Sequence, residues 1–500
     1  MIELSAEEIA EITAGTLRGV PDPAAVRVRH ADTDSRSMVA DSLFIAKPGE
    51  TTDGHRFIDV ALAAGATLVL AERETQTPHG APHPSVIVTD VVTAMGQIAA
   101  AILDRVRAHS ATTVIGITGS AGKTTTKDLL KSILEPEGPT VAPQGSYNGE
   151  VGVPLTIFTA ELDTRYVVVE MGADAPGNIR ELAEMVRPDI GAVLMVGSAH
   201  AGKFGGADKI AAVKAELVEE ISATGAVVLN RDDAQVAPMA KAAKAPITWF
   251  SEDTGQETGP DGGQAAGGDH AAATPDQVRA VDLSLDEAGH PRFQLRFTES
   301  GEEFPLVSGL TGAHHVSNLL AAAACALRAG VAPHAIAERL NGLGPASRWR
   351  MERTERADGV TLINDAYNAN PESMREALRT LAMLTRPGQG RPARRSVAVL
   401  GAMLELGDVS IPKHTQLGET VVRLNIDKTL VVGDLAYPLY RGAIAEGSWG
   451  SEVHWVATVE EAEAYLDQEL APGDIVLFKS SNSAGLRLLG DKIAAKEGAL

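Results

Sequence analysis

A glycine-rich stretch at residues 118–126, Thr-Gly-Ser-Ala-Gly-Lys-Thr-Thr-Thr, constrains this chain more than any other feature. An apolar run predicts a buried strand over 112–117 directly before it, and the pattern over 126–134 predicts a helix directly after it. Strand, glycine turn and helix in this order are typical of a phosphate-binding loop, because the glycines let successive N–H groups and the helix N-terminus face an anion. The chain is therefore predicted to bind a nucleoside triphosphate.

Each position of the stretch has an expected part in that binding. Lys123 can reach the β- and γ-phosphates, and the Thr124 hydroxyl can ligate Mg²⁺. The predicted nucleotide-binding positions are Gly119, Ser120, Ala121, Gly122, Lys123, Thr124 and Thr125. A chance strand–turn–helix junction is the alternative, and the common register of strand, glycines, lysine and threonine argues against it.

Length, charge and cysteine content narrow the class of protein. A chain of 500 residues is too long for one core, which predicts two to four domains. A net charge of −22 without a long basic patch argues against nucleic-acid binding. The single cysteine, Cys325, excludes an intrachain disulfide and fits a reducing cytosol. Neither a secretory signal pattern nor an apolar run near the ~18 residues of a membrane span is present, so we expect a cytoplasmic protein without membrane insertion.

Three regions of alternating strands and helices predict an α/β fold with three domains. Residues 1–108 are typical of a small α/β domain, and 109–344 predict a mostly parallel sheet behind the phosphate loop. Residues 345–500 predict a second open α/β sheet, Rossmann-like but without the G-x-G-x-x-G fingerprint. Within the central region, 251–276 is rich in Gly, Ala, Asp and Thr without periodicity, which predicts an exposed, mobile insertion.

Three side chains downstream of the loop are candidates for the chemistry. Glu170 ends a predicted buried strand, where a carboxylate would stand beside Mg²⁺; a glutamate facing solvent at a strand exit is the alternative. His200 also follows a predicted strand and would share the mouth of the sheet, although a lone histidine is more often a surface residue. Lys214 on pattern alone is a solvated helix lysine.

A nucleotide between two sheets suggests a reaction that joins two substrates in a closing cleft. A carboxylate is a poor acyl donor, but transfer of the γ-phosphoryl group gives an acyl phosphate that an amine can attack. Lys123 and Mg²⁺ would stabilise the charge that develops in both steps. The phosphate loop itself serves ATPases and kinases equally, so the loop alone does not select this reaction.

These residues together resemble the Mur ligases, ATP-dependent amino-acid and peptide ligases of peptidoglycan precursor synthesis, along essentially the whole chain. The matching segments are 118–125, Glu170, His200, 213–216, 312–318 and 348–351. The resemblance implies ATP and two Mg²⁺ ions as cofactors, with Thr124, Glu170 and His200 as metal ligands. It also implies that CO₂ carbamylates Lys214 and that the carbamate helps to hold the second ion.

The resemblance further implies how the nucleotide is surrounded. Asn318 would lie at the adenine and Asp365 near the ribose, and Arg350 would reach the γ-phosphate. Because Arg350 and Asp365 belong to a different predicted domain from Lys123, we expect hinge closure near residue 345 to complete the site. The implied catalytic residues are Lys123, Lys214, His200 and Arg350.

Further motifs resemble the family members that make the last of the four additions, joining D-alanyl-D-alanine to UDP-N-acetylmuramoyl-tripeptide. These motifs lie at 169–177, 365–371 and 400–407, and the Asp-Asn-Pro-Arg motif of the diaminopimelate-adding members is absent. The implied substrate contacts are Ser35, Arg36, Gly54, His55, Asn148, Asn368 and Asn370, and a monomer is expected. The alternatives are a sibling ligase that adds a different amino acid and a nucleotide switch that is not a ligase. The switch would be marked by loss of the metal set, all of which is present.

Three positions depart from the family pattern. His315 replaces an asparagine of the adenine segment, Ala402 stands where an aspartate is common, and Asn482 stands where the last strand's motif usually has arginine. They put a hydrogen bond to the base and a substrate contact in question. None belongs to the predicted ATP or metal set.

Overall fold

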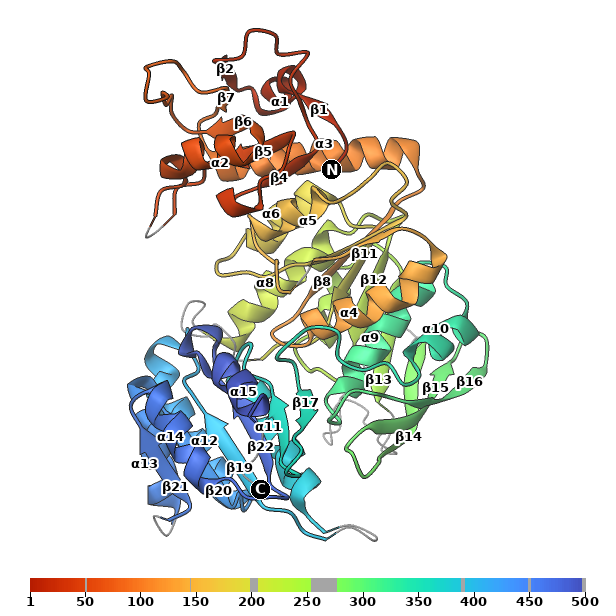
Figure 1. Ribbon diagram of the computed structural model, residues 1–500. Coiled ribbons are helices and arrows are strands. Elements are labelled where there is room, and N and C mark those ends of the chain that lie inside the picture. Colours follow the sequence, from red (N-terminus) through yellow and green to blue (C-terminus); the bar gives the residue numbers. More distant parts are fainter. Residues whose placement is uncertain are drawn as a thin grey trace.

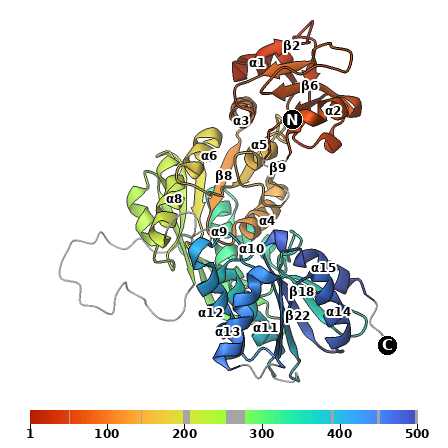
Figure 2. The same cartoon turned by 90° about the vertical axis from the view of Figure 1, so that its left-hand side faces the viewer.

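The computed structural model describes residues 1–49, 52–143, 145–197, 206–252, 277–387, 392–447 and 451–496. Within these ranges the strands form sheets of two, five, nine and six members. Figures 1 and 2 show an N-terminal unit at one end, a central unit around the nine-stranded sheet, and a C-terminal unit at the other end. The α/β fold predicted from the sequence is confirmed.

The N-terminal unit is built on a five-stranded sheet of order β2-β7-β6-β5-β4. Its strands are β2 (Thr16–Arg18), β4 (His30–Asp32), β5 (Ser42–Ile45), β6 (Ala66–Ala71) and β7 (Ser85–Ile87); β1 (Leu4–Ser5) pairs separately with β3 (Arg27–Val28). Its helices are α1 (Ala6–Thr13), α2 (Ile58–Ala64) and α3 (Val91–His109). The expected Ser5–Glu8 capping box starts α1.

The central sheet has the order β16-β15-β14-β13-β12-β11-β8-β10-β9 and is parallel from β9 to β14. The pairs β14–β15 and β15–β16 are antiparallel. Its strands are β8 (Thr113–Thr118), β9 (Thr140–Val141), β10 (Tyr166–Glu170), β11 (Ile190–Val193), β12 (Ala226–Asn230), β13 (Ile247–Glu252), β14 (Val278–Leu285), β15 (Pro291–Phe297) and β16 (Glu302–Val307). Its helices are α4 (Lys123–Leu134), α5 (Gly152–Ile157), α6 (Asn178–Val186), α8 (Ala207–Glu220), α9 (His315–Arg328) and α10 (Pro333–Leu340).

Helices cover both faces of the middle of this sheet, which is why β8, β10, β11 and β12 are buried almost throughout. All five residues of β10 are buried, and successive side chains enter opposite cores. Val167 and Val169 join the core formed with α3, α5, α6 and α8, whereas Tyr166 and Val168 join the core formed with α4, α9 and α10. The sheet is therefore a rigid support whose strand ends can hold a site.

The C-terminal sheet has the order β17-β18-β22-β19-β20-β21 and is parallel except for the β17–β18 pair. Its strands are β17 (Glu352–Glu355), β18 (Thr361–Asn364), β19 (Ser396–Leu400), β20 (Lys428–Val432), β21 (Val453–Val456) and β22 (Ile475–Lys479). Its helices are α11 (Pro371–Thr385), α12 (Ser410–Arg423), α13 (Tyr437–Glu446), α14 (Val459–Glu469) and α15 (Leu486–Ala494). Among the described helices, none has the length and apolarity that crossing a bilayer requires.

Two predicted segments differ from the structure. The predicted insertion 251–276 begins too early, because Ser251 and Glu252 complete β13; residues 253–276 lie outside the described ranges. The apolar run over 191–196, which precedes His200, predicts one strand, but the strand ends at Val193. There the chain turns alongside the phosphate loop, and the Met195 carbonyl accepts from the Ser120 N–H at 2.9 Å.

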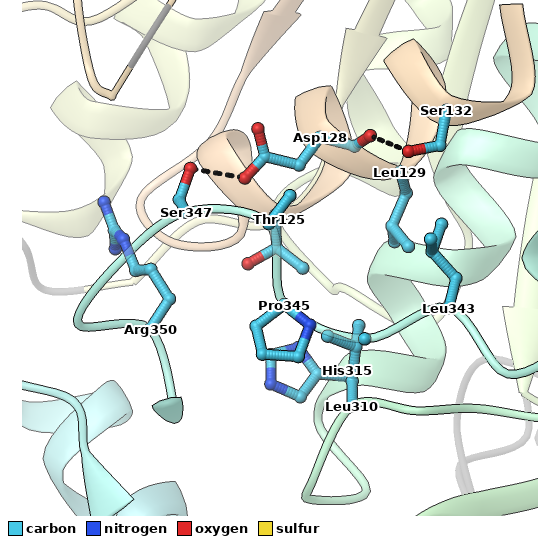
Figure 3. Close-up of a pocket in the computed structure, with 12 residues that line it drawn as sticks. Thr125, Asp128, Leu129, Ser132, Leu310, His315, Leu343, Pro345, Ser347 and Arg350 are labelled. Atoms are coloured by element: carbon cyan, nitrogen blue, oxygen red, sulfur yellow. Dashed lines mark hydrogen bonds between the residues drawn. The ribbon is translucent and has the colours of Figure 1, made fainter. Parts of the chain in front are cut away.

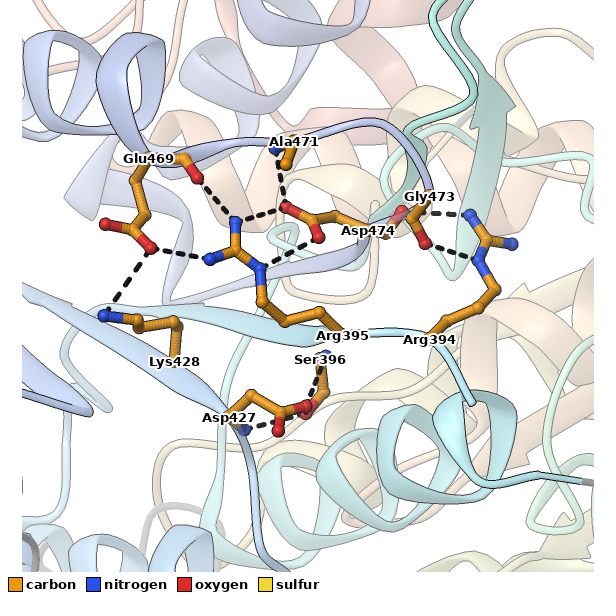
Figure 4. A network of polar contacts seen from close by, with 9 residues as sticks. All are labelled: Arg394, Arg395, Ser396, Asp427, Lys428, Glu469, Ala471, Gly473 and Asp474. Atoms are coloured by element: carbon orange, nitrogen blue, oxygen red, sulfur yellow. Dashed lines mark hydrogen bonds and ion pairs between the residues drawn. The ribbon is translucent and has the colours of Figure 1, made fainter. Parts of the chain in front are cut away.

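The Pro-, Gly- and Arg-rich composition of residues 386–395 predicts a solvated loop, but Arg394 and Arg395 at its end belong to a polar network (Figure 4). Arg395 forms ion pairs with Asp474 at 2.7 Å and with Glu469 at 2.8 Å, and these carboxylates raise its pKa. Arg394 donates from Nε to the Gly473 carbonyl at 2.6 Å. The two arginines thus join the start of β19 to the start of β22, a structural role that composition does not reveal.

Candidate nucleotide site

The phosphate loop is formed as the sequence predicts, between β8 and α4. Gly122 precedes the first residue of α4 with φ at 87°. A Cβ added at Gly122 would lie only 2.2 Å from Asn318 Oδ1, so both the backbone conformation and the space require glycine. Lys123 Nζ donates to the Gly119 carbonyl at 2.6 Å, which keeps the ammonium inside the loop.

A polar cluster joins the loop to Glu170 and Arg350. Thr124 Oγ1 lies 3.2 Å from Glu170 Oε2 and 2.8 Å from Ser146 Oγ. Arg350 Nη2 donates to Thr124 Oγ1 at 3.1 Å and to Ser146 Oγ at 3.2 Å. Arg350 is therefore already in contact with the loop from the C-terminal side, and Ser146 is a member that sequence reasoning missed.

The second oxygen of Glu170 has no hydrogen-bond partner although it is buried. Burial raises the pKa of Glu170, and the positive charges of Lys123, Lys127 and Arg350 oppose that rise. An orphaned carboxylate oxygen beside a threonine hydroxyl is the donor chemistry that Mg²⁺ prefers. Among the described residues, no group of three or more Asp, Glu, His or Cys side chains is arranged so that it could hold a metal ion. The other predicted protein ligand, His200, lies outside the described residues.

The cluster opens into a cavity of about 600 Å³ between the central and C-terminal sheets. The predicted residues that line it are Gly119, Ser120, Ala121, Gly122, Lys123, Thr124, Thr125, Asn148, Lys214, Asn318, Arg350, Asp365, Asn368 and Asn370. It also has lining residues that sequence reasoning missed, among them Asn230, Glu252, Glu376 and Lys479. These four lie far from the loop in sequence, and no local motif marks them.

The C-terminal sheet contributes a buried ion pair and a helix start. Lys479 Nζ lies 2.6 Å from Asp365 Oδ2 and donates to the Asn368 carbonyl at 3.1 Å. Asn370 caps α11 and reaches back to the Ser120 carbonyl at 3.4 Å. Both predicted substrate asparagines of this region therefore line the cavity, held by backbone contacts.

Lys214 is buried on α8, not solvated as its helical pattern alone suggests. Burial lowers its pKa to about 7, and the nearby charge of Lys123 acts in the same direction. Within the described part of the chain, no carboxylate forms an ion pair with it. A substantial fraction of a lysine with such a pKa carries a neutral, nucleophilic amine at neutral pH.

In the segment predicted to hold adenine, His315 and Asn318 contact each other. Asn318 Nδ2 lies 3.3 Å from His315 Nδ1, and Thr126 Oγ1 lies 3.5 Å from Asn318 Oδ1. Burial lowers the pKa of His315 well below its ordinary value, so the ring is neutral. Asn318 is thus held by the loop helix and by the residue that departs from the family pattern.

The other two departures lie in the C-terminal unit. Asn482 accepts hydrogen bonds from Arg487 through both its backbone and its side-chain oxygen. A guanidinium therefore reaches this position from α15 even though residue 482 is not arginine. Ala402 is buried, and its carbonyl accepts from the Ser481 N–H at 2.9 Å.

The predicted contacts Ser35, Arg36, Gly54 and His55 do not line the cavity; they lie in the N-terminal unit (Figure 1). Ser35 and Arg36 belong to a short 3₁₀ turn, and Arg36 forms an exposed ion pair with Asp34 at 2.7 Å. His55 is buried, 2.7 Å from Asp53, and its Nε2 accepts from the Glu72 N–H.

A small pocket follows the connection from α10 to the C-terminal sheet (Figure 3). Pro345, Ser347 and Arg350 line it opposite Thr125 and Asp128 of α4. Ser347 Oγ donates to Asp128 Oδ2 at 2.5 Å, and Asp128 also pairs with buried Lys127 at 2.7 Å. The connection is therefore attached to the phosphate-loop helix just before Arg350.

Comparison with known proteins shows which family this chain resembles. The Mur ligase middle domain matches residues 117–326, the glutamate ligase domain of Mur ligases matches 349–482, and the domain described as Mur ligase family, catalytic domain, matches 27–117. The chain is 41% identical to the UDP-N-acetylmuramoyl-tripeptide–D-alanyl-D-alanine ligase of Mycobacterium tuberculosis (strain ATCC 25618 / H37Rv), over 99% of both chains. It is 30% identical to the Bacillus subtilis (strain 168) ligase of the same name, over 98% of this chain and 97% of that one.

Solved structures agree over the same length. A crystal structure of MurF from Acinetobacter baumannii is similar with a TM-score of 0.82 and 28% identity, over 99% of both chains. The MurF ligase of Thermotoga maritima in complex with ADP has a TM-score of 0.72 and 26% identity, over 93% of this chain and 97% of that one. From these matches, the chain belongs to the Mur ligase family.

Proposed function

We propose that this protein is an ATP-dependent ligase that joins D-alanyl-D-alanine to UDP-N-acetylmuramoyl-tripeptide in peptidoglycan precursor synthesis. The observation that carries the proposal is the 41% identity, along 99% of both chains, with a ligase named for that reaction. The cavity supports the proposal, because the phosphate loop of the central unit and Arg350 of the C-terminal unit meet there in one polar cluster. Such a site suits phosphoryl transfer to a second substrate.

The chemistry follows from what a carboxylate lacks. Its oxygen is a poor leaving group, so the γ-phosphoryl group of ATP first moves to the tripeptide carboxylate and ADP leaves. The amine of D-alanyl-D-alanine then attacks the acyl phosphate, the peptide bond forms and inorganic phosphate leaves. Lys123, Arg350 and the loop N–H groups stabilise the negative charge that develops on the transferred group.

Glu170 and Thr124 would hold Mg²⁺, as the orphaned oxygen of Glu170 indicates. The ion, when bound, neutralises phosphate charge and polarises the transferred group. His200 is proposed as a further ligand, together with the carbamate of Lys214 for a second ion. The neutral Lys214 amine attacks CO₂, an N–C bond forms and one proton is released, which turns a neutral amine into an anionic carbamate. ¹³C NMR with ¹³C-bicarbonate would detect the carbamate, and Lys214→Met would abolish its signal.

The remaining assignments are proposals of the same kind. Asn318 and Asp365 contact the nucleoside, Asn148, Asn368 and Asn370 contact the reacting ends, and Ser35, Arg36, Gly54 and His55 contact the UDP end of the substrate. We propose domains at 1–108, 109–344 and 345–500. We also propose that the protein is a monomer that works in the cytoplasm without binding nucleic acid or inserting into the membrane.

The deciding experiment measures phosphate release from ATP and Mg²⁺ with UDP-N-acetylmuramoyl-tripeptide, in the presence and absence of D-alanyl-D-alanine. We expect release to depend on both substrates and mass spectrometry to show a UDP-pentapeptide. Turnover driven by another amino acid would overturn the named step. Release that no acceptor stimulates would overturn the ligase itself.

A further inference from the structure

The backbone on either side of Arg350 adopts a conformation that side chains disfavour. Trp349 has φ at 59° and Met351 has φ at 52°, both in the left-handed region. Neither residue is glycine, so each conformation is costly and persists only where the surroundings hold it. Two such residues around one arginine indicate that the position of Arg350 is imposed by its neighbours.

The structure shows what holds the first of them. Trp349 Nε1 lies 3.1 and 3.0 Å from the two carboxylate oxygens of Asp491, on α15. Arg348 forms an ion pair with the same carboxylate at 2.9 Å. The Trp349 N–H donates to Glu352 Oε2 at 2.9 Å. Both ends of the residue, side chain and backbone, are therefore fixed to acids of the C-terminal unit.

The indole is also enclosed by positive groups. The guanidinium of Arg348 lies 4.9 Å from the ring centroid of Trp349, and that of Arg487 lies 5.2 Å from it. Asp491 additionally accepts from Asn364 at 3.2 Å, at the end of β18. The ring is thus attached to a strand and a helix that belong to the rigid part of the sheet.

On the other side of Arg350, the Met351 N–H donates to Asp365 Oδ1 at 3.1 Å, and Asp365 pairs with buried Lys479. Arg350 then extends to Thr124 and Ser146, with its guanidinium 4.3 Å from the ring centroid of Tyr367. Its Nε is buried without a hydrogen-bond partner. Asp491 therefore holds the residue before Arg350 and Asp365 holds the residue after it, which fixes the backbone from which Arg350 reaches the phosphate loop.

We propose that Trp349 and Asp491 are a positioning pair that aligns Arg350 with the transferred phosphoryl group, an inference that rests on the proposed function. A merely space-filling tryptophan would not need its N–H between two carboxylate oxygens. Loss of that hydrogen bond leaves the left-handed backbone at 349 unsupported, and Arg350 relaxes away from Thr124. The nucleotide contacts of the loop stay intact.

The test replaces Trp349 by phenylalanine, which keeps the ring and removes the N–H. Trp455→Phe is the matched control, since Trp455 also donates its Nε1–H, to the Gly433 carbonyl at 3.2 Å, in the same sheet but outside the cavity. We expect Trp349→Phe to lower kcat on the order of 10-fold or more while KM for ATP changes less than about twofold. Trp455→Phe should leave both unchanged.

A second readout separates alignment from general damage. When Arg350→Lys is already present, adding Trp349→Phe should lower kcat by less than a further factor of about two, because the residue through which Trp349 acts is already altered. The positioning role would be overturned if the fold-losses of kcat for Trp349→Phe and Arg350→Lys multiplied in the double variant. It would also be overturned if Trp349→Phe and Trp455→Phe lowered kcat equally. Asp491→Leu, which removes both acceptor oxygens, should reproduce the kcat loss.

A structural readout keeps the inference independent of the proposed reaction. In a crystal structure of Trp349→Phe, we expect Arg350 Nη2 to lie beyond hydrogen-bonding distance of Thr124 Oγ1. A retained contact near 3.1 Å would overturn the inference even if the native enzyme ligates. Conversely, a native protein that shows no substrate-dependent phosphate release would overturn the proposed function, while the crystal structure would still decide whether the pair positions Arg350.

Discussion

The two sheets that meet at the cavity supply their functional groups in different ways. The central sheet uses consecutive residues 119–125, with glycine backbone and the first turn of α4. The C-terminal unit uses separate side chains, Arg350, Asp365 and Lys479. Lys479 pairs with Asp365, and the two neighbours of Arg350 in the chain are bound by Asp365 and Asp491. One half of the site, residues 119–125, is thus a local motif, and the other half is assembled from residues distant in sequence. Mutations in the two halves should therefore have different effects on activity and stability.

The largest loss of activity is expected from a mutation in the phosphate loop. Lys123→Ala removes the ammonium at the Gly119 carbonyl and should lower kcat for phosphate release by roughly 10³-fold, because charge on the transferred group loses a preorganised partner. Lys131→Ala is the control: this lysine is on the same helix, partly exposed and paired with Glu135. A Lys123→Ala enzyme within tenfold of native would show that the loop lysine is not part of the chemistry.

The assembled half should lose stability as well as activity. Lys479→Met leaves Asp365 without its ion-pair partner and should lower the free energy of unfolding by about 3 kcal/mol, measured by urea denaturation. Lys428→Met, at a more exposed pair with Glu469, should cost below about 1 kcal/mol. Equal costs for the two variants would mean that the buried pair does not hold this half together.

A smaller effect, on KM for ATP, is expected from adding a side chain at Gly122 in the phosphate loop. Gly122→Ala introduces a Cβ near Asn318 Oδ1 at a φ of 87°, and we expect KM for ATP to rise about tenfold as the loop shifts. Gly177→Ala separates the two causes, because Gly177 has φ at 94° and open space around its Cβ position. Similar KM values for both variants would show that strain alone, not the contact with Asn318, is responsible.

Only slow reaction is expected at Cys325, which is buried in the hydrophobic core on α9. Burial raises its pKa from 9.0 to about 12, so the folded thiol stays protonated while an unfolded one ionises. Between these values the unfolded chain loses its proton first, so this group lowers stability as pH rises from 9 and contributes nothing below it. Labelling by a disulfide reagent at pH 8 should be slow in the native state and fast in urea; fast native labelling would contradict the buried position.

The sequence predicted the parts of the fold that repeat locally. The strands around β8 and β10, the helix after the loop and the second α/β sheet follow from apolar runs separated by helical patterns. Strands β9, β14 and β16 were missed. Two-residue β9 and mostly exposed β16 give no clear pattern, whereas the alternating burial of β14 is a period-2 signal that was overlooked. The insertion was predicted to begin at Ser251, whereas β13 continues to Glu252.

Residues of the candidate site divide along the same line. Lys123, Thr124 and Glu170 could be found from the sequence, because a loop and a strand end are local features. The burial of Lys214 could not be seen in its helical pattern, since which helix face meets the cavity depends on packing. Ser146 and Lys479 lack any local signal that would connect them to the loop.

The sequence by itself determined the phosphate loop, the α/β class and the family, because each rests on short-range patterns or on identity along the chain. Only the tertiary structure decided that Arg350 touches Thr124, that Glu170 keeps an unpaired oxygen and that Trp349 is held by Asp491. The two contacts join residues 226 and 142 positions apart. Hydrogen bonds and ion pairs act over a few ångströms in space, and only the folded chain brings such residues that close.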